Sequence, residues 1–221
     1  MRSAAATLRE WVREGRTVVH EADSKALLGE AGVALPRRDP TSGACVVKLC
    51  SDQHPHKTEH GLVKLNVPVA QIGEVGASLR ARDSAGVVIV EEMIEDGVAE
   101  WIVGCRHDAT FGPITVIGAG GIFVELINEA KARLAPVNTE TASRAIRSQR
   151  ACRLLMGARG RPEGDIEGLI GVVTSVSSFF AEHADLIEQI EVNPVIVRPV
   201  GQGAVAADAL MVLRSRAQFQ N

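Results

Sequence analysis

Short apolar runs typical of buried strands are interleaved with helical patterns along the whole chain, and this mixture limits the folds that the chain can adopt. The run ACVVKL at residues 44–49 and a second run at residues 62–67 flank a polar loop, which resembles a β-hairpin. No glycine-rich loop follows the first strand, and strands and helices do not alternate regularly, so a simple doubly wound nucleotide-binding sheet is disfavoured. We therefore expect a mixed α/β fold of α+β character.

The remaining elements follow from the same periodicities. Strands are expected at 86–94, 100–107, 114–117, 122–125, 187–198 and 204–213, and helices at 4–13, 21–31, 69–82, 140–156 and 166–183. Gly201-Gln202-Gly203 separates the last two strands, which predicts a terminal hairpin. Glu95-Asp96-Gly97 follows a strand, and 221 residues suffice for two lobes of roughly 100 residues each, so a lobe boundary is expected there.

Composition excludes several classes of protein. Lys and Arg number 24 against 27 Asp and Glu, a net charge of −3, and 3% of residues are aromatic with no Tyr, which disfavours nucleic-acid binding. No apolar run approaches the ~18 uncharged residues of a membrane helix, and no signal-peptide core is present. The four cysteines form no CxxC or CxxH pair, which argues against zinc and redox sites. A cytoplasmic protein without nucleic-acid or membrane partners is expected.

Lys48 lies inside the apolar run at 44–49. A buried ammonium without a partner costs several kcal/mol, so an anion is expected beside it, and a phosphate is one candidate. The alternatives are that strand alternation points Lys48 to solvent, or that a carboxylate pairs with it. The polar loop that follows contains His56, Lys57, His60 and Gly61, and amides and cations in such a loop can converge on phosphate oxygens.

Carboxylates also mark the end of the strand at 86–94. Glu91 and Glu92 precede Met93 and Ile94, and Glu100 follows a glycine-containing turn. These carboxylates are either solubilising charges or part of a site in which the strand backbone recognises a purine edge and a carboxylate accepts ribose hydroxyls.

A glycine cluster and a polar strand face are two further candidates. Gly120 and Gly121, in the sequence GAGG, permit close approach of the backbone to a ligand, although a tight strand connection is equally consistent. Glu191 and Asn193 lie two residues apart and share a strand face, and Asp208 could lie opposite them. Hard oxygen ligands of this kind suit Mg²⁺, and the alternative is the polar face of an edge hairpin.

These segments, in their order along the chain, resemble the ATP-grasp subunit of nucleoside-diphosphate-forming acyl-CoA synthetases. This family includes the ADP-forming acetate–CoA ligases, and succinyl-CoA synthetase is a more distant relative. The resemblance spans roughly residues 18–213. The matching segments are VVKL, HKTE, HGLVKLNV, VVIVEEMI, AEWIVG, RHDATFGP, GAGGIFVE, RLAP, GARG and IEVNPVIV.

The resemblance implies a two-lobed ATP-grasp fold that binds ATP or ADP and Mg²⁺ between its lobes. The implied divisions are an N-terminal extension at 1–17, a shortened small lobe at 18–96 and a large lobe at 97–221. In the complete enzyme, acyl-CoA and phosphate form an acyl phosphate on a separate CoA-binding part, and a histidine there carries the phosphoryl group to ADP. A CoA-binding, phosphohistidine-bearing partner subunit is therefore expected, in a hetero-oligomer.

The resemblance also assigns roles to individual residues. His56 would be a second phosphohistidine in the relay, and Lys48 would hold nucleotide phosphates. The other implied contacts are Lys57, Gly61, Gly120 and Gly121 near phosphates, Glu92, Met93 and Ile94 at adenine, Glu100 at ribose, and Asn193 and Asp208 at Mg²⁺, with Glu191 as a ligand or its supporter.

Two features depart from the family pattern. The sequence His60-Gly61-Leu62 has one glycine where the family has two, and the stretch at 36–44 is short. Two other functions therefore stay open. One is a stand-alone ATP-grasp ligase that phosphorylates a carboxylate directly, and the other is a degenerate module that binds nucleotide or a partner without turnover.

Overall fold

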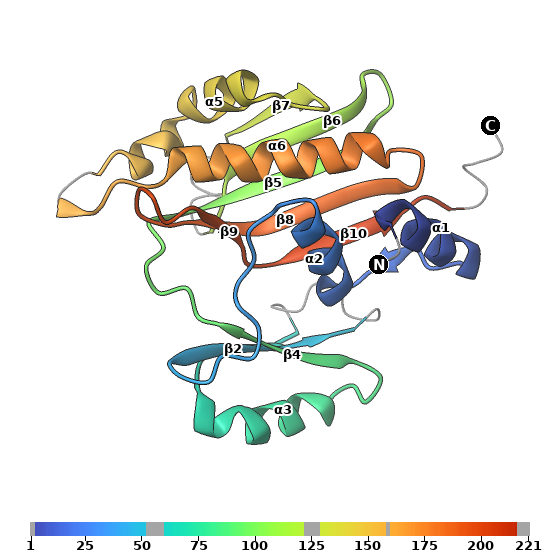
Figure 1. The fold of residues 1–221 in the computed structure, drawn as a ribbon, viewed down its shortest axis with the longest axis vertical. Helices are drawn as coiled ribbons and strands as arrows, with labels where there is room; N and C mark the ends of the chain where they lie inside the picture. Colours follow the sequence, from blue (N-terminus) through green and yellow to red (C-terminus); the bar gives the residue numbers. More distant parts are fainter. Residues whose placement is uncertain (1–2, 52–59, 122–128, 158–159, 216–221) are drawn as a thin grey trace.

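The computed structural model describes residues 3–51, 60–121, 129–157 and 160–215, which form two antiparallel sheets joined by two crossings of the chain (Figure 1). The helices are α1 (Ala4–Glu14), α2 (Glu21–Glu30), α3 (Ile72–Arg80), α5 (Thr139–Arg147) and α6 (Ile166–Glu182), with 3-10 segments η1 (Val69–Gln71) and η2 (Arg150–Leu155). The strands are β1 (Val18–Val19), β2 (Ala44–Cys50), β3 (Val63–Pro68), β4 (Val87–Glu92), β5 (Ala99–Asp108), β6 (Gly112–Ala119), β7 (Ala130–Leu134), β8 (Ile187–Val197), β9 (Ala204–Ala206) and β10 (Ala209–Leu213).

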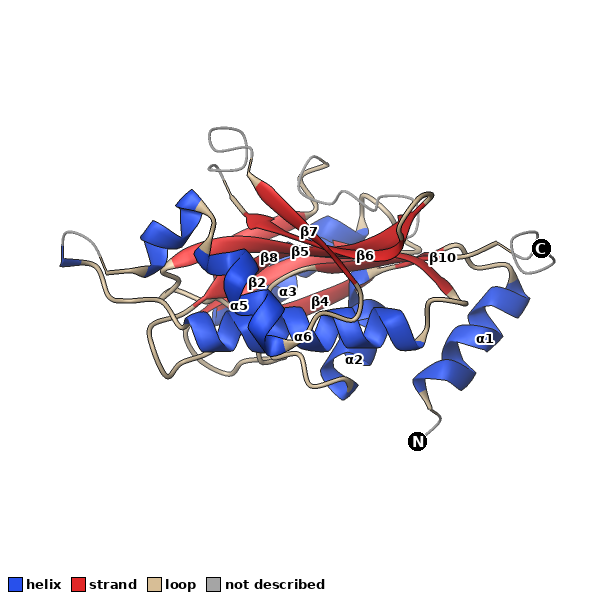
Figure 2. Cartoon of the chain, turned by 90° about the horizontal axis from the view of Figure 1, so that it is seen from above, coloured by secondary structure: helices blue, strands red, loops and turns tan. Residues whose placement is uncertain are grey.

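The larger sheet has seven strands in the order β1-β10-β8-β5-β6-β7, with β9 also paired to β8. Figure 2 shows α2, α5 and α6 on the same side of this sheet. Helix α6 covers the sheet because Leu169, Val173, Val176 and Phe180 recur at helical spacing and are buried in the main core. Most of the apolar core of the protein therefore lies between this sheet and its helices.

The smaller sheet has the order β3-β2-β4, and α3 covers the side that faces away from the larger sheet (Figure 1). Because side chains alternate along a strand, Val47 and Leu49 of β2 pack in the cluster that contains Leu79 of α3. Val46 and Lys48 consequently point to the opposite face, toward the larger sheet. This alternation carries the polar side chains of the small sheet to the space between the two sheets.

Most of the predicted elements are confirmed. The hairpin at 44–67 is β2 and β3, paired antiparallel, and the terminal hairpin is β8 with β9 and β10. Part of the chain differs: the helix predicted at 140–156 ends at Arg147, because the side chain of Gln149 turns back to the carbonyl oxygens of Ala145 and Ile117, at 3.0 and 3.2 Å. Strand β7 was not predicted, and the strand predicted at 122–125 lies outside the described residues.

Residues 18–35, which the sequence assigned to the small lobe, lie with the larger sheet. Strand β1 pairs with β10, and Leu27, Leu28 and Val33 are buried in the core of the larger sheet. The small sheet itself runs from Ala44 to Glu92, and the N–H of Met93, the next residue, bonds to the carbonyl of Ala44. The division of the chain at residues 17 and 96 stays a prediction.

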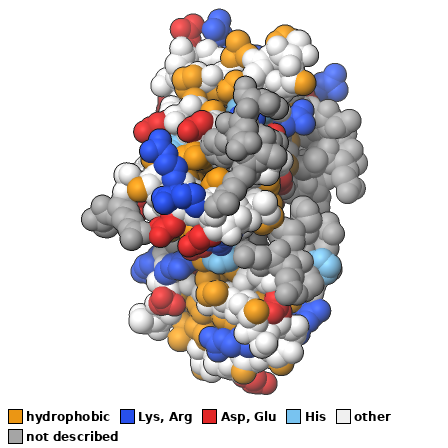
Figure 3. All heavy atoms as spheres, turned by 90° about the vertical axis from the view of Figure 1, so that its right-hand side faces the viewer, with side chains coloured by type: hydrophobic (Ala, Val, Ile, Leu, Met, Phe, Trp, Pro, Cys, Tyr) orange, Lys and Arg blue, Asp and Glu red, His pale blue; other side chains and the backbone are white. Residues whose placement is uncertain are grey.

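Among the described residues, no helix combines the length and the apolar character needed to cross a bilayer. All four cysteines are buried, and none of them forms a disulfide bond with another described residue. On the face drawn in Figure 3, acidic and basic side chains are interspersed over both lobes. The described side chains on that face do not form the single-sign basic surface that phosphate backbones require.

Asp165 links the start of α6 to the turn between β8 and β9, and its loss is expected to destabilise the fold. Its Oδ1 accepts the N–H of Gly168 at 2.8 Å, and its Oδ2 accepts those of Gly201 and Gly203, each at 2.9 Å. We expect Asp165→Ala to lower the free energy of unfolding by about 1–2 kcal/mol in chemical denaturation, because three N–H groups lose their acceptor. The exposed Asp185→Ala is the control; an equal effect in both variants would contradict this role.

The same carboxylate gives a pH-dependent expectation. Burial raises the pKa of Asp165, but backbone N–H donors, those of Gly168, Gly203, Gly201 and Glu167, outweigh burial and hold the pKa below its usual range. The stabilisation is therefore present above the usual pKa of about 3.9 and is lost as the pH falls through the lowered value. In acid denaturation, the difference in unfolding free energy between the wild type and Asp165→Ala should shrink toward low pH.

Candidate functional site

A cavity of about 380 Å³ lies between the small sheet and the larger sheet, within the size range of small-molecule sites. Both sheets and the two connections between them contribute to its walls. Its lining is Pro36, Val46, Lys48, Val63, Leu65, Glu91, Glu92, Met93, Ile94, Glu100, Asn193, Pro194, Ile196, Ala207 and Asp208. Seven residues that the sequence proposed for a site, and that lie as much as 160 positions apart, therefore meet in one cavity: Lys48, Glu92, Met93, Ile94, Glu100, Asn193 and Asp208.

The apolar part of this lining comes from both sheets. Val46 and Val63 belong to the neighbouring strands β2 and β3, and Ile196 belongs to β8 of the larger sheet. Met93 and Ile94 follow β4 in the connection between the sheets. An apolar slot with polar groups at its edges can accept a flat heterocycle and orient it by backbone hydrogen bonds.

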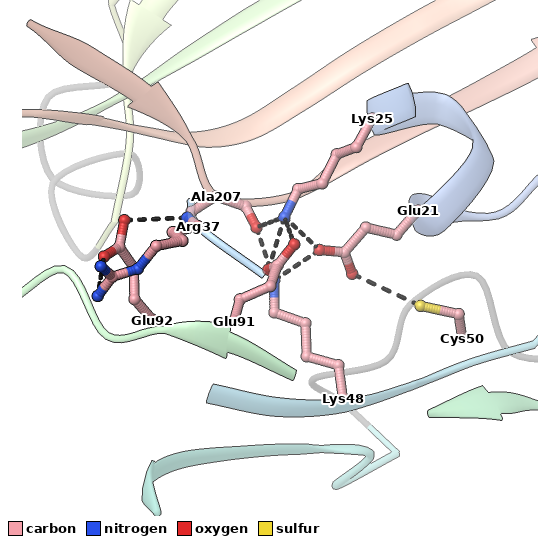
Figure 4. Close-up of polar contacts among 8 residues, drawn as sticks. All are labelled: Glu21, Lys25, Arg37, Lys48, Cys50, Glu91, Glu92 and Ala207. Atoms are coloured by element: carbon pink, nitrogen blue, oxygen red, sulfur yellow. Dashed lines mark hydrogen bonds and ion pairs between the residues drawn. The ribbon is translucent and has the colours of Figure 1, made fainter. Parts of the chain in front are cut away.

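Lys48 is buried in a cluster of four charged side chains, drawn in Figure 4 with the carbonyl of Ala207. Its Nζ contacts Oε1 of Glu21 at 2.6 Å, Oε2 of Glu91 at 3.1 Å and the Ala207 oxygen at 2.6 Å. Nζ of Lys25 contacts Oε1 of Glu21 at 2.8 Å, both oxygens of Glu91 at 2.8 and 2.7 Å, and the same carbonyl at 2.6 Å. Of the partners left open by the sequence, carboxylates are the ones observed here.

The cluster is electrically balanced, since two ammonium groups face two carboxylates. Burial lowers the pKa of Lys48, but Glu21, Glu91 and Asp208 outweigh burial and raise the pKa above its usual range. Burial lowers the pKa of Lys25 below its usual range, and the charge of Lys48 lowers it further, against the carboxylates. Lys48 is therefore a firmly charged cation at the wall of the cavity.

The segment at 92–94 is anchored to the connection that precedes β2. The backbone N–H of Arg37 donates to Oε1 of Glu92 at 2.9 Å, and Nη2 of Arg37 lies 3.3 Å from Oε2 (Figure 4). The N–H of Glu92 bonds to the carbonyl of Arg37, and that of Met93 bonds to Ala44. These bonds hold the backbone of the segment at the cavity wall.

Glu100, at the start of β5, lines the cavity, and the two predicted glycines pack against it. The N–H of Gly120 donates to the Glu100 carbonyl at 2.8 Å. A Cβ at Gly120 would lie 3.0 Å from the Glu100 backbone, and one at Gly121, where φ is +62°, would lie 2.6 Å from its carboxylate. These glycines therefore permit close approach to Glu100, and neither lines the described cavity.

The phosphate-loop residues are placed only in part. Gly61 has φ of +64° and its carbonyl accepts from Arg82 at 3.1 Å, but it does not line the described cavity. His56 and Lys57 lie outside the described residues.

Asn193 and Asp208 both line the cavity, and the backbone N–H of Asn193 donates to the Asp208 carbonyl at 3.2 Å. Nδ2 of Asn193 lies 3.3 Å from Oε1 of Glu191, which leaves the amide oxygen of Asn193 as the group for a cation. Among the described residues no three His, Cys, Asp or Glu side chains are grouped as a metal site. An amide oxygen and a carboxylate nevertheless fit Mg²⁺ that takes its other ligands from phosphates and water.

Three cluster residues were not predicted from the sequence as site residues: Glu21, Lys25 and Ala207. One signal existed for two of them: Glu21 and Lys25 have the i,i+4 spacing of a helical ion pair. This spacing does not place them beside Lys48, because that contact depends on how the sheets pack.

The chain is similar to known proteins in both sequence and fold. The family model described as ATP-grasp domain matches residues 10–213. The β subunit of ADP-forming acetate–CoA ligase II from Pyrococcus furiosus is 28% identical over 228 residues, which cover 94% of this chain and 96% of that subunit. The β subunit of ligase I from the same organism is 33% identical over 176 residues, 76% of this chain and 74% of that subunit.

Single-chain relatives are longer. The chain is 31% identical over 180 residues to the ADP-forming acetate–CoA ligase of Methanocaldococcus jannaschii, but it spans only 25% of that protein. Among solved structures, the dinucleotide-forming acetyl-coenzyme A synthetase 1 of Ca. Korarchaeum cryptofilum, in complex with coenzyme A and Mg-AMPPCP, has a TM-score of 0.82 at 26% identity. The match covers 96% of this chain and 100% of that one. In the Korarchaeum structure, the phosphohistidine segment points towards the nucleotide binding site. The chain therefore belongs to the ATP-grasp domain family, among whose members are the β subunits of ADP-forming acetate–CoA ligases.

Proposed function

We propose that the chain is the nucleotide-binding subunit of an ADP-forming acid–thiol ligase, and that it transfers a phosphoryl group between a phosphohistidine and ADP or ATP. The observation that carries this proposal is the cavity that collects Lys48, Glu100, Asn193 and Asp208 around an apolar slot. Adenine occupies the slot beside the backbone of residues 92–94, and the carboxylate of Glu100 accepts the ribose hydroxyls. Lys48 and a Mg²⁺ ion on Asn193 and Asp208 meet the phosphates.

The transfer needs little covalent chemistry from the protein. In the direction of ATP formation, a terminal oxygen of ADP bonds to the phosphorus of the phosphohistidine while the P–N bond breaks, and its electron pair returns to the imidazole. Lys48 neutralises charge on the phosphoryl oxygens, and the surrounding side chains exclude water and hold the nucleotide in line. Mg²⁺ supplies further neutralisation of the phosphate charge when it is bound. His56 serves as a second histidine carrier in this relay.

A partner subunit that binds CoA and carries the first phosphohistidine completes the proposed ligase. The support is that this chain covers 96% of a separate β subunit and only 25% of a single-chain ligase. We infer the cytoplasm as the compartment, because four buried cysteines without a disulfide bond among the described residues are typical of a reducing environment.

Lys48→Ala is expected to weaken ATP binding about tenfold to a hundredfold, because a charge-assisted contact of roughly 1.5–3 kcal/mol is lost. Calorimetric titration of ADP and ATP, with and without Mg²⁺, measures this. Lys64→Ala is the matched control, since Lys64 is exposed and does not line the cavity. Equal affinities of the wild type and a folded Lys48→Ala variant would contradict the role of Lys48.

The same titration separates the other two functions. Failure of the folded wild type to bind ADP and ATP would contradict the proposal and favour a degenerate module. Nucleotide hydrolysis stimulated by a small carboxylic acid, in the absence of any partner, would favour a stand-alone carboxylate ligase.

Asp208→Ala is expected to remove most of the gain in ATP affinity that Mg²⁺ provides, because the ion loses its protein carboxylate. ATP binding without Mg²⁺ should change little. Asp185→Ala, an exposed aspartate that does not line the cavity, should retain the full effect of Mg²⁺. An unchanged Mg²⁺ dependence in Asp208→Ala would exclude Asp208 as a ligand.

His56→Ala is expected to bind ADP and ATP as the wild type does, and to lower ligase turnover about a hundredfold or more in the reconstituted complex, because the relay loses its nucleophile. Nucleotide titration of the same variant verifies its fold. Full ligase activity of His56→Ala would show that the relay does not pass through this histidine.

A further inference from the structure

Two buried lysines make the same contacts, although only one of them lies at the cavity. Lys48 contacts the carboxylates of Glu21 and Glu91 and the carbonyl of Ala207. Lys25 contacts all three of these acceptors as well, at 2.6–2.8 Å (Figure 4). An ammonium group has three N–H donors, so Lys25 alone can serve every acceptor that Lys48 serves.

The two lysines differ in access. The side chain of Lys48 is 7% exposed and lines the cavity, whereas that of Lys25 is 2% exposed and does not line it. A phosphate in the cavity can therefore reach Lys48 but not Lys25. Lys25 comes from α2, which packs with the larger sheet, while Lys48 and Glu91 come from β2 and β4 of the small sheet.

We propose that Lys25 is a positioning residue that releases Lys48 to the nucleotide phosphates. When Lys48 turns from the cluster to a phosphate, Lys25 stays with Glu21, Glu91 and Ala207 and leaves none of them without a donor. This inference rests on the proposed function, because it concerns the nucleotide that binds in this cavity.

The charge balance explains why the second lysine matters. Without Lys25, two buried carboxylates share one ammonium group, and moving Lys48 to a phosphate would take the last lysine away from both of them in a poorly solvated site, which is strongly unfavourable. Glu91 is one of the residues that line the cavity, so the charge of its carboxylate would also repel an approaching phosphate. Lys25 lowers both penalties without touching the nucleotide, because one ammonium group stays in contact with both carboxylates.

The test is titration of the chain with Mg-ATP and, separately, with adenosine, which lacks phosphates. Lys25→Met is expected to weaken ATP binding about tenfold or more and to leave adenosine binding unchanged, since only the phosphates depend on Lys48. Lys64→Met makes the same change at an exposed position of β3 and should bind both ligands as the wild type does. A purely structural role of Lys25 would instead weaken both ligands together.

A second substitution restores the charge balance. In Lys25→Met/Glu91→Gln one cation faces one anion, and ATP affinity should recover toward the wild-type value relative to Lys25→Met. If Lys25→Met does not fold, the double variant is compared with Glu91→Gln alone, and ATP binding about fivefold weaker in the double variant is expected.

The outcomes separate this inference from the proposed function. Two results would overturn the role of Lys25 while leaving the proposed function intact, provided that the wild type binds ATP. One is an ATP affinity of Lys25→Met equal to that of the wild type. The other is an ATP affinity of the double variant equal to that of Glu91→Gln. Absence of ATP binding by the folded wild type would overturn the proposed function, and this inference with it.

Discussion

The cluster of Glu21, Lys25, Lys48 and Glu91 is the interaction on which the arrangement of the two sheets depends. It joins α2 to β2 and β4, and the carbonyl of Ala207 adds the connection between β9 and β10. Isolated ions would be very costly at this depth, but two cations and two anions with short contacts neutralise one another. The small sheet is thereby held against the larger sheet by groups that also form one wall of the cavity.

The cluster lies on the face of the small sheet that forms a wall of the cavity, so Lys48 and Glu91 both hold the sheets together and line the cavity. The small sheet buries Val47 and Leu49 against α3, so its other face carries Val46, Lys48 and Glu91 toward the larger sheet. On the side of the larger sheet the cavity is lined by Asn193 and Asp208, whose oxygens are suited to a hard cation. A cation, hard oxygen ligands and an apolar slot then lie within one cavity of about 380 Å³, an arrangement that matches a nucleoside polyphosphate.

The local sequence pattern was sufficient to predict most helices and strands. It failed where a contact with a residue far along the chain determines where an element ends or which sheet it packs against. The hairpin of β2 and β3 and the long helix α6 follow from alternation and helical periodicity. The end of α5 does not, because Gln149 bonds to the carbonyl of Ile117, 32 residues away. The placement of β1 and α2 with the larger sheet likewise depends on pairing with β10 near the other end of the described chain.

The sequence by itself determined the mixed α/β class, the main strands and helices, and the candidate residues Lys48, Glu100, Asn193 and Asp208, because residue type and spacing are local properties. Only the tertiary structure decided that Lys48 meets Glu21 and Glu91 and shares Ala207 with Lys25, since these contacts span 27 to 182 residues. The physical reason is desolvation: a buried lysine must find carboxylates, but which ones it finds depends on how the two sheets pack.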